Sequence, residues 1–149
     1  LNHKLTPLFI PQVIVRHHGK GDSDIIEKIL KELKKQNINY NYLNEDLSLI
    51  ELMNTYKKCK FLIGTRLHSC ILAANVSTPI IPIRYQGFKS QGVAKALGQE
   101  NLLLDIHTIS PKKLISKIDY ILNNSDDIKK VLSKKTETFK QNIHQVKLL

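Results

Sequence analysis

The sequence predicts an α/β fold built on one doubly wound, parallel sheet of about five strands. Short apolar runs alternate along the chain with longer stretches in which apolar residues recur at helical spacing. Strands that alternate with helices in this way pair in parallel and are covered by helices. At 149 residues and 42% hydrophobic content the chain fits one domain with a core. We therefore expect a single domain over residues 1–149, with residues 1–11 as a leader or linker.

Five short runs account for the expected strands. Val13–Val15 is an apolar run of the kind that forms a buried strand. In the second, Ile38, Tyr40 and Tyr42 alternate with asparagines, which is typical of a half-buried strand. The remaining expected strands are Phe61–Ile63, Ile80–Ile83 and Leu102–Leu104. Pro82 within the fourth strand would suit an edge or a bulge, because proline cannot donate to the ladder.

The expected helices follow from capping residues and apolar periodicity. A short polar side chain can cap a helix by accepting from unpaired backbone N–H groups, so helices are expected to start at Asp22, Ser23 or Asp24 and after Ser48. Proline is favoured at the first helical position, so another helix is expected to start at Pro111. Asn37 and Gly98 are expected to end helices. Further helices are expected at Leu67–Asn75, at Val93–Leu97 and, rich in lysine, over residues 126–149. Leu67–Asn75 is almost wholly apolar and is therefore expected to be buried.

Arginine is rare in this chain and stands at one kind of position. Only three of the 23 basic residues are arginines, and each ends an apolar run: Arg16, Arg66 and Arg84. If these runs are parallel strands, the three guanidinium groups gather at the carboxyl edge of the sheet, where open α/β folds bind ligands. Arginine presents a planar fork that matches a carboxylate or phosphate. The pattern predicts a site for a small polyanion.

Composition narrows the class of protein. The net charge is +10, but the lysines are spread over the expected helices, which favours a solvated surface. A weak preference for a membrane surface or an acidic polymer is the alternative, and specific nucleic-acid binding is not expected. No apolar run could cross a bilayer and no signal peptide is visible, so a cytoplasmic location is expected. Cys59 and Cys70 are expected to be reduced thiols, and no ligand cluster predicts a metal.

The densest group of chemical signals is Gly64–Ser69, between an expected strand and an expected helix. Gly64 and Thr65 allow a sharp turn, and the first turn of the helix offers free N–H groups and the positive end of the dipole. Arg66 adds a fixed charge, and His68 adds a group that titrates near neutral pH. A histidine that merely fills the helix start is the alternative for His68. A serine hydrolase is not indicated, because Ser69 has no aspartate partner at a recognisable spacing.

The run from Gly64 through the alanine-containing helix, Pro79 and the strand after it, Tyr85 and Lys89 resembles the polysaccharide pyruvyl transferases. Their pattern is Gly-x-Arg-Leu-His, a helix, Gly-x-Pro, an apolar strand and Tyr-x-x-Lys. Here Ser77 stands at the glycine of Gly-x-Pro, and Gly87-Phe88 lengthens the tyrosine–lysine gap by one residue. The matching motif covers residues 61–98, about a quarter of the chain.

The resemblance implies a fold and an activity. Such transferases move the enolpyruvyl carbons of phosphoenolpyruvate onto two hydroxyls of a sugar in a cell-surface exopolysaccharide. They are built like two-domain GT-B glycosyltransferases with Rossmann-like halves. This chain is similar to the C-terminal, donor-binding half, which implies an N-terminal partner domain, a saccharide or lipid-linked saccharide acceptor and no cofactor. Whether the chain is active alone is left open.

The resemblance and the residues together name the site. His68 and Arg66 are the candidate catalytic residues. The candidate substrate-binding residues are Arg16, Gly64, Thr65, Arg84, Tyr85 and Lys89. His17 and His18 follow Arg16 and are weaker candidates to line the cleft. Two other functions stay open: a GT-B-like domain that binds a nucleotide sugar, and a non-catalytic module for an anionic polymer or membrane.

Overall fold

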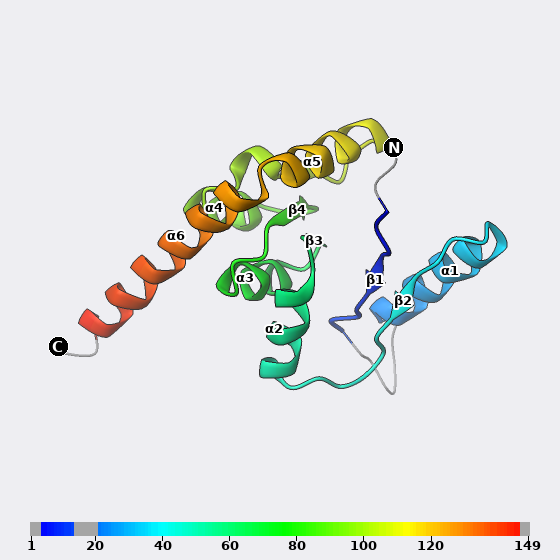
Figure 1. The fold of residues 1–149 in the computed structure, drawn as a ribbon, viewed down its shortest axis with the longest axis horizontal. Coiled ribbons are helices and arrows are strands. Elements are labelled where there is room, and N and C mark those ends of the chain that lie inside the picture. The colour runs from blue at the N-terminus through cyan, green and yellow to red at the C-terminus, as the bar shows by residue number, and fades with distance from the viewer. Residues whose placement is uncertain (1–3, 14–20, 147–149) are drawn as a thin grey trace. The chain divides into compact units, whose positions relative to one another are not determined.

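The computed structural model describes residues 4–13 and 21–146, and their side chains as far as residue 142. The chain divides into two compact units, Leu1–Leu47 and Ser48–Leu149. Within the described residues, five strands form two parallel sheets, one of two strands and one of three (Figure 1). The parallel α/β class is thus confirmed, but a single sheet of about five strands is not observed. The doubly wound and GT-B arrangements, and one domain over residues 1–149, stay predictions.

The first unit contains a strand where a leader was expected. β1 (Leu8–Phe9) pairs in parallel with β2 (Asn41–Tyr42), and α1 (Asp22–Lys35) lies between them in sequence. The expected strand at Val13–Val15 is wrong at Val13, and its other two residues lie outside the described part. The reason is local. The Val13 N–H donates to the Asp22 carboxylate at 3.1 Å, and its carbonyl accepts from the Asp22 N–H at 3.1 Å, so both groups serve the helix start.

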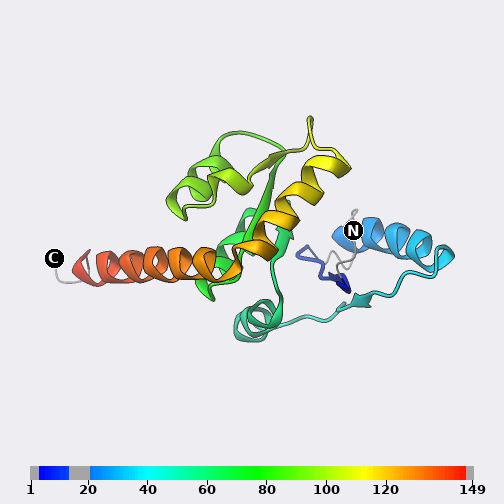
Figure 2. The same cartoon turned by 45° about the horizontal axis from the view of Figure 1, so that its top comes forward.

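The second unit holds the larger sheet. β3 (Leu62–Gly64), β4 (Ile80–Arg84) and β5 (Leu104–Asp105) are parallel and adjacent in the order β3-β4-β5. The helix α3 (Leu67–Asn75) joins the first pair and packs on both strands, and α4 (Lys89–Ala96) packs on β4. Figure 2 shows α6 (Ser125–Val146) as a long helix whose C-terminal turns extend beyond the rest of this unit. This helix contacts α3 and α5 (Pro111–Asn123), and its N-terminal part includes the buried residues Ile128 and Leu132.

Pro82 lies in the central strand rather than at an edge, and the pairing explains why. The carbonyl of Pro79 accepts from the N–H of Leu62 in β3. The carbonyl of Arg84 accepts from the N–H of Ile106, just after β5. Residues along a strand direct their backbone groups alternately to the two neighbours, so Pro82 directs its nitrogen to the β5 side. β5 pairs with β4 only from Ile83 onward. The N–H that proline lacks would therefore meet no strand, and no ladder bond is lost.

Most helix boundaries agree with the capping signals. As expected, Ser48 caps α2 (Leu49–Lys58) and α5 begins at Pro111. The structure adds a reciprocal capping box between Ser48 and Glu51 and an N-cap at Ser110. The helix at Leu67–Asn75 has the expected bounds. By contrast, α4 begins at Lys89 rather than Val93, and Leu102 belongs to a 3₁₀ turn (Glu100–Leu102) rather than to β5. The first helix has Gly21, not an acidic or serine side chain, at its N-cap.

Three helices of the described part end in the same way. The residue two places beyond the last helical residue has a positive φ in α1, α3 and α4: Asn37 (54°), Ser77 (59°) and Gly98 (68°). In each case two backbone N–H groups turn back onto carbonyls of the last helical turn. This is the Schellman arrangement, in which the left-handed position favours glycine and tolerates asparagine.

The end of α3 sets the entry to β4. The Thr78 N–H donates to the Ala73 carbonyl and the Ser77 N–H to the Ala74 carbonyl, both at 2.9 Å. The buried Thr78 hydroxyl then donates to the carbonyl of Tyr56 at 2.9 Å, which ties this turn to α2. Ser77 is the residue that replaces the glycine of Gly-x-Pro. The structure thus shows that this position is a left-handed helix end, where glycine would carry no steric cost.

Candidate functional site

The predicted site residues that the structure describes converge on one edge of the three-stranded sheet. Gly64 is in register with Pro82, so Thr65 and Arg66 leave β3 at the same edge at which Arg84 and Tyr85 leave β4. β5 ends there too, with Asp105 opposite Arg84. This carboxyl edge is the place where parallel α/β sheets accept ligands.

The turn out of β3 is built by a close contact. A β-carbon on buried Gly64 would lie 2.7 Å from the Cys70 sulfur, a separation that real β-carbons do not adopt. The Cys70 thiol donates to the Gly64 carbonyl at 3.6 Å, and burial raises the pKa of this thiol to about 12. Cys70 is therefore a neutral packing group that holds the turn against α3.

The N-terminus of α3 carries the candidate catalytic residues. Arg66 occupies the N-cap, and no side chain caps the first turn. Thr65, Arg66 and His68 are exposed, so the imidazole is not part of the core packing. Ser69, in the same turn, is buried, and its hydroxyl has no hydrogen-bond partner. An uncapped helix start next to a guanidinium and an imidazole has the chemistry to hold a phosphate and to move a proton.

Arg84 is at the same edge, but its guanidinium is engaged. Its Nε donates to the Asp105 carboxylate at 3.1 Å and its Nη2 donates to the same oxygen, while Nη1 donates to Gln91 at 3.4 Å. The hydrogen bond from Arg84 is the main reason that the pKa of Asp105 lies below its ordinary value, and the backbone N–H of His107 adds to it. The Arg84 charge is thus paired within the protein, and its role as a substrate fork stays a prediction.

The loop after β4 is exposed and aromatic. Tyr85 and Lys89, both named from sequence, are exposed, and Gly87 turns the chain with φ of 63°. Phe88 was not named from sequence, yet its side chain is 79% exposed. Phe88 lies in the lengthened gap between Tyr85 and Lys89, but its apolar character gave no sign of this exposure. His107, an exposed residue just after β5, also reaches this edge and was not named.

The comparison with protein families decides the relationship. The family model described as polysaccharide pyruvyl transferase matches residues 8–87, more than half of the chain. The chain belongs to this family. A curated relative, the amylovoran biosynthesis protein AmsJ of Erwinia amylovora, is 29% identical over 116 residues. The alignment covers 78% of this chain and 28% of AmsJ, so the chain spans well under half the length of this relative. No solved structure matches the chain.

Membership in the pyruvyl transferase family extends further toward the N-terminus than the motif at residues 61–98 indicated. The match begins at β1 and includes Gly64–Ser69, Arg84 and Tyr85. It ends at Gly87, one residue before Phe88 and two before Lys89. Arg16, His17 and His18 fall inside the family match but outside the residues that the structure describes. The nucleotide-sugar alternative receives no support from these matches.

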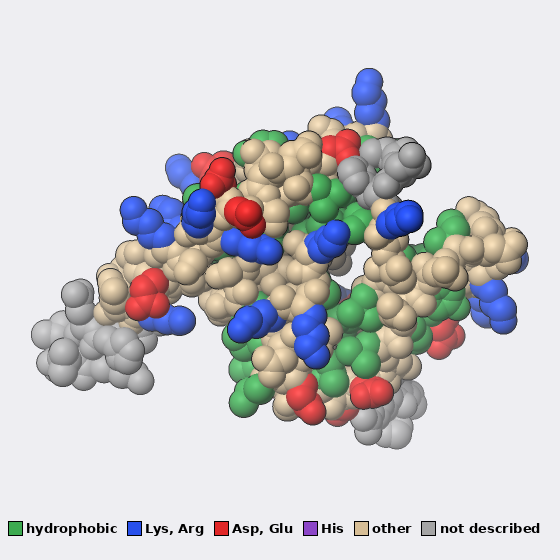
Figure 3. Space-filling model, viewed as in Figure 1, with side chains coloured by type: hydrophobic (Ala, Val, Ile, Leu, Met, Phe, Trp, Pro, Cys, Tyr) green, Lys and Arg blue, Asp and Glu red, His purple; other side chains and the backbone are tan. Residues whose placement is uncertain are grey.

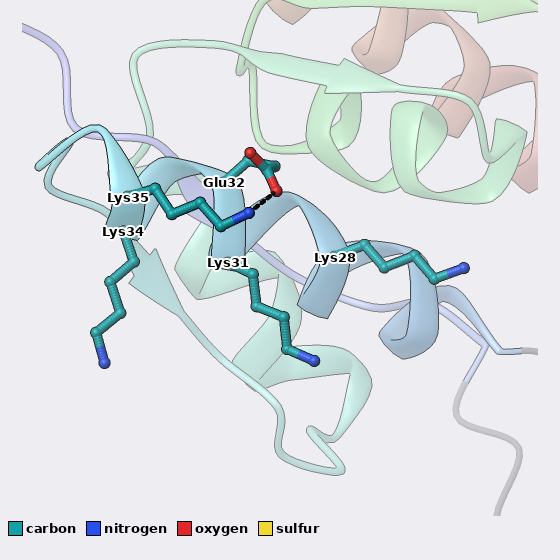
Figure 4. Close-up of a pocket in the computed structure, with 5 residues that line it drawn as sticks. All are labelled: Lys28, Lys31, Glu32, Lys34 and Lys35. Carbon is teal, nitrogen blue, oxygen red and sulfur yellow. Dashed lines mark hydrogen bonds and ion pairs between the residues drawn. The ribbon is translucent and has the colours of Figure 1, made fainter.

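The lysines of this pyruvyl transferase family member are dispersed. Figure 3 shows basic side chains scattered over the visible face with acidic ones among them. In the first unit, a shallow hollow is lined by residues of a single helix, α1: Lys28, Lys31, Glu32, Lys34 and Lys35. Figure 4 shows their side chains fanning outward, with Lys35 paired to Glu32 at 2.7 Å. A hollow of this kind on one exposed helix is a solvated surface rather than a donor site.

Two further searches cover the described residues alone. Among them, no three His, Cys, Asp or Glu side chains are grouped so that they could hold a metal ion. Nor does the described part of the chain include a helix with the length and apolar character needed to cross a membrane.

Proposed function

We propose that this chain is the donor-binding part of a transferase that moves the pyruvyl group of phosphoenolpyruvate onto two hydroxyls of a sugar, forming a ketal. The observation that carries the proposal is the uncapped start of α3 with exposed Arg66 and His68 at the carboxyl edge of the sheet. It lies within the segment that matches the family model. The proposal needs no resident cofactor.

Phosphoenolpyruvate carries two anionic groups, a phosphate and a carboxylate. The first-turn N–H groups of α3 and the helix dipole suit the phosphate. The planar fork of Arg66 suits the carboxylate or a second face of the phosphate. We assign the larger share of donor binding to the α3 start, because its backbone N–H groups and exposed Arg66 and His68 lie within the family match. Thr65 and Gly64 bring the backbone close to the ligand, and Arg16 and Lys89 remain candidates for further contacts.

His68 is proposed as the proton donor and acceptor. A proton adds to the methylene carbon of the enolpyruvyl group, and a sugar hydroxyl then bonds to the adjacent carbon and loses its proton. The bond from that carbon to the phosphate oxygen breaks, and phosphate leaves. The second hydroxyl bonds to the same carbon and loses its proton, which completes the ketal. Imidazole is the side chain most often used for proton transfers of this kind.

The rest of the proposal concerns the whole protein. The share of AmsJ that the chain covers, 28%, supports an additional partner domain, which we place N-terminal in a GT-B-like arrangement. We propose a saccharide or lipid-linked saccharide acceptor for an exopolysaccharide and a cytoplasmic reaction, close to the inner face of the membrane.

Calorimetry tests the donor site: the full chain is titrated with phosphoenolpyruvate at fixed ionic strength. Arg66→Lys keeps the charge but loses the fork, so it should weaken binding by roughly tenfold, whereas Lys134→Gln, on exposed α6, should not. Equal affinity of Arg66→Lys and the parent chain would refute the site. A nucleotide sugar in the same titration should not displace phosphoenolpyruvate.

Phosphate release in the presence of a saccharide acceptor tests the proton transfers. His68→Ala should lower turnover by about 10²-fold or more if the imidazole acts as general acid and base. Donor affinity should change much less. A turnover loss of only a few-fold would rule out His68 as the general acid and base.

A further inference from the structure

The loop between β4 and α4 presents two aromatic rings to solvent. Tyr85 is 53% exposed and Phe88 is 79% exposed, and no large apolar side chain in the described part of the chain is more exposed than Phe88. The loop has four residues, Tyr85–Phe88, and leaves the carboxyl edge directly after Arg84. Two exposed rings this close in sequence are unusual, because burial of an aromatic side chain is one of the largest gains in folding.

Phe88 also breaks a local rule. It is the N-cap residue of α4, and no side chain caps that helix. Serine, threonine, aspartate or asparagine at this position would stabilise the helix by about 1 kcal/mol. Phenylalanine at Phe88 therefore contributes neither to the core nor to the helix start. Residues that conflict with both burial and local structure are concentrated at functional sites.

The base of the loop is held in place. Before the loop, Arg84 is paired with Asp105, and after it, Gln91 accepts a hydrogen bond from Arg84 at 3.4 Å. Gly87, with φ of 63°, makes the turn that brings Phe88 to the helix start. A loop anchored on both sides by one side chain is preorganised, and Arg84 acts as its positioning residue.

We infer that Tyr85 and Phe88 form an aromatic platform for a pyranose ring of the saccharide acceptor, an inference that rests on the proposed function. One face of a pyranose carries C–H groups whose hydrogens are partly positive, and these are attracted to the negative face of an aromatic ring. Exposed Gln86 lies between Tyr85 and Phe88 in sequence and exposed Lys89 follows Phe88, and both can bond sugar hydroxyls. This mixture suits a sugar, whereas a protein-binding patch would be a more continuous apolar surface.

Saturation-transfer NMR of the full chain with methyl glucoside, galactoside and mannoside at millimolar concentration tests the platform. At least one pyranoside should receive saturation through its ring protons, and Phe88→Ala and Tyr85→Ala should each reduce the effect at least fivefold. Phe139→Ala is the matched control, since Phe139 is an exposed aromatic residue on α6, far along the chain from this edge. Phosphoenolpyruvate binding is measured on the same variants.

The outcomes separate the two proposals. Loss of the sugar signal in Phe88→Ala with unchanged phosphoenolpyruvate affinity supports the platform. Donor binding without any sugar signal, or a signal that Phe88→Ala and Tyr85→Ala leave intact, overturns the platform while the proposed function stands. A sugar signal that depends on Phe88 in a chain that does not bind phosphoenolpyruvate keeps the platform and removes the donor site.

Discussion

The Cys70 sulfur occupies the space that a β-carbon on residue 64 would need, at 2.7 Å from that position. The glycine that begins the family motif is therefore required here by packing against α3, and not by a positive φ. Because Gly64 and Cys70 lie on opposite sides of Arg66 and His68 in sequence, their contact fixes the geometry of the turn that presents both side chains.

Gly64→Ala should destabilise the chain by about 1–3 kcal/mol, because the added carbon forces a shift of the Cys70 side chain or of the backbone. Cys70→Ala removes the obstacle, so the double variant should be more stable than the sum of the single effects predicts. Urea denaturation of the four proteins measures this coupling. Gly92→Ala, where a β-carbon meets nothing within 4 Å, should instead stabilise α4 by about 0.5–1 kcal/mol. Strict additivity would contradict the contact.

Alkaline pH should lower the free energy of unfolding because the Cys70 thiol is buried. Its pKa is raised from 9.0 to about 12, so the unfolded chain loses this proton first as the pH rises. The stability that the neutral thiol provides is fully present below pH 9 and is lost as the pH rises from 9 through about 12. Between pH 8.5 and 10.5 the parent chain should lose about 2 kcal/mol more unfolding free energy than Cys70→Ala does. Parallel profiles would contradict the prediction. Burial also raises the pKa of the half-buried Cys59 thiol, so Cys59→Ala is measured beside Cys70→Ala to separate the two thiols.

Ser77→Gly should stabilise the chain. Ser77 has φ of 59°, in the left-handed region where a side chain is strained and glycine is not. The expected gain is about 0.5–1 kcal/mol, measured as a shift of the urea midpoint at unchanged slope. Ser133→Gly, in the exposed middle of α6, should lose a similar amount, because glycine is a poor helix former. A loss of stability in Ser77→Gly would show that the Ser77 side chain has a role beyond the turn.

Acid should weaken the link between Arg84 and Asp105. The pKa of Asp105 is lowered in the folded chain, chiefly by the hydrogen bond from Arg84. The stability from this carboxylate is present above its ordinary pKa of 3.8 and is lost as the pH falls below that value toward the folded pKa. The parent chain should therefore be more stable than Asp105→Asn at pH 6, and the difference should shrink below pH 4. A constant difference across that range would mean that the ionised pair is not responsible.

The helices were largely predictable because their signals are local. Ser48, Pro111 and Asn37 mark helix ends through hydrogen bonds and backbone angles that involve a few neighbouring residues. The site segment Gly64–Ser69 was predictable for the same reason, since a strand end, a glycine and a helix start follow one another in sequence.

The strands were less predictable because their pairing depends on distant residues. Val13 has the apolar character of a strand residue, but Asp22 takes both of its backbone groups. Likewise, nothing near Arg84 in sequence shows that Asp105 will neutralise it, because their contact depends on the register of β4 and β5. Phe88 was overlooked because an apolar residue in a loop carries no signal of its exposure.

Pro82 has a consequence for the way the sheet can grow. Up to Pro82, β4 pairs with β3 alone, and its pairing with β5 starts at Ile83. Because Pro82 has no N–H on the β5 side, β5 cannot extend its pairing with β4 back past Ile83. The β3 pairing therefore covers Ile80–Pro82 and the β5 pairing covers Ile83–Arg84, so β5 alone holds the end of β4 that leads into the aromatic loop.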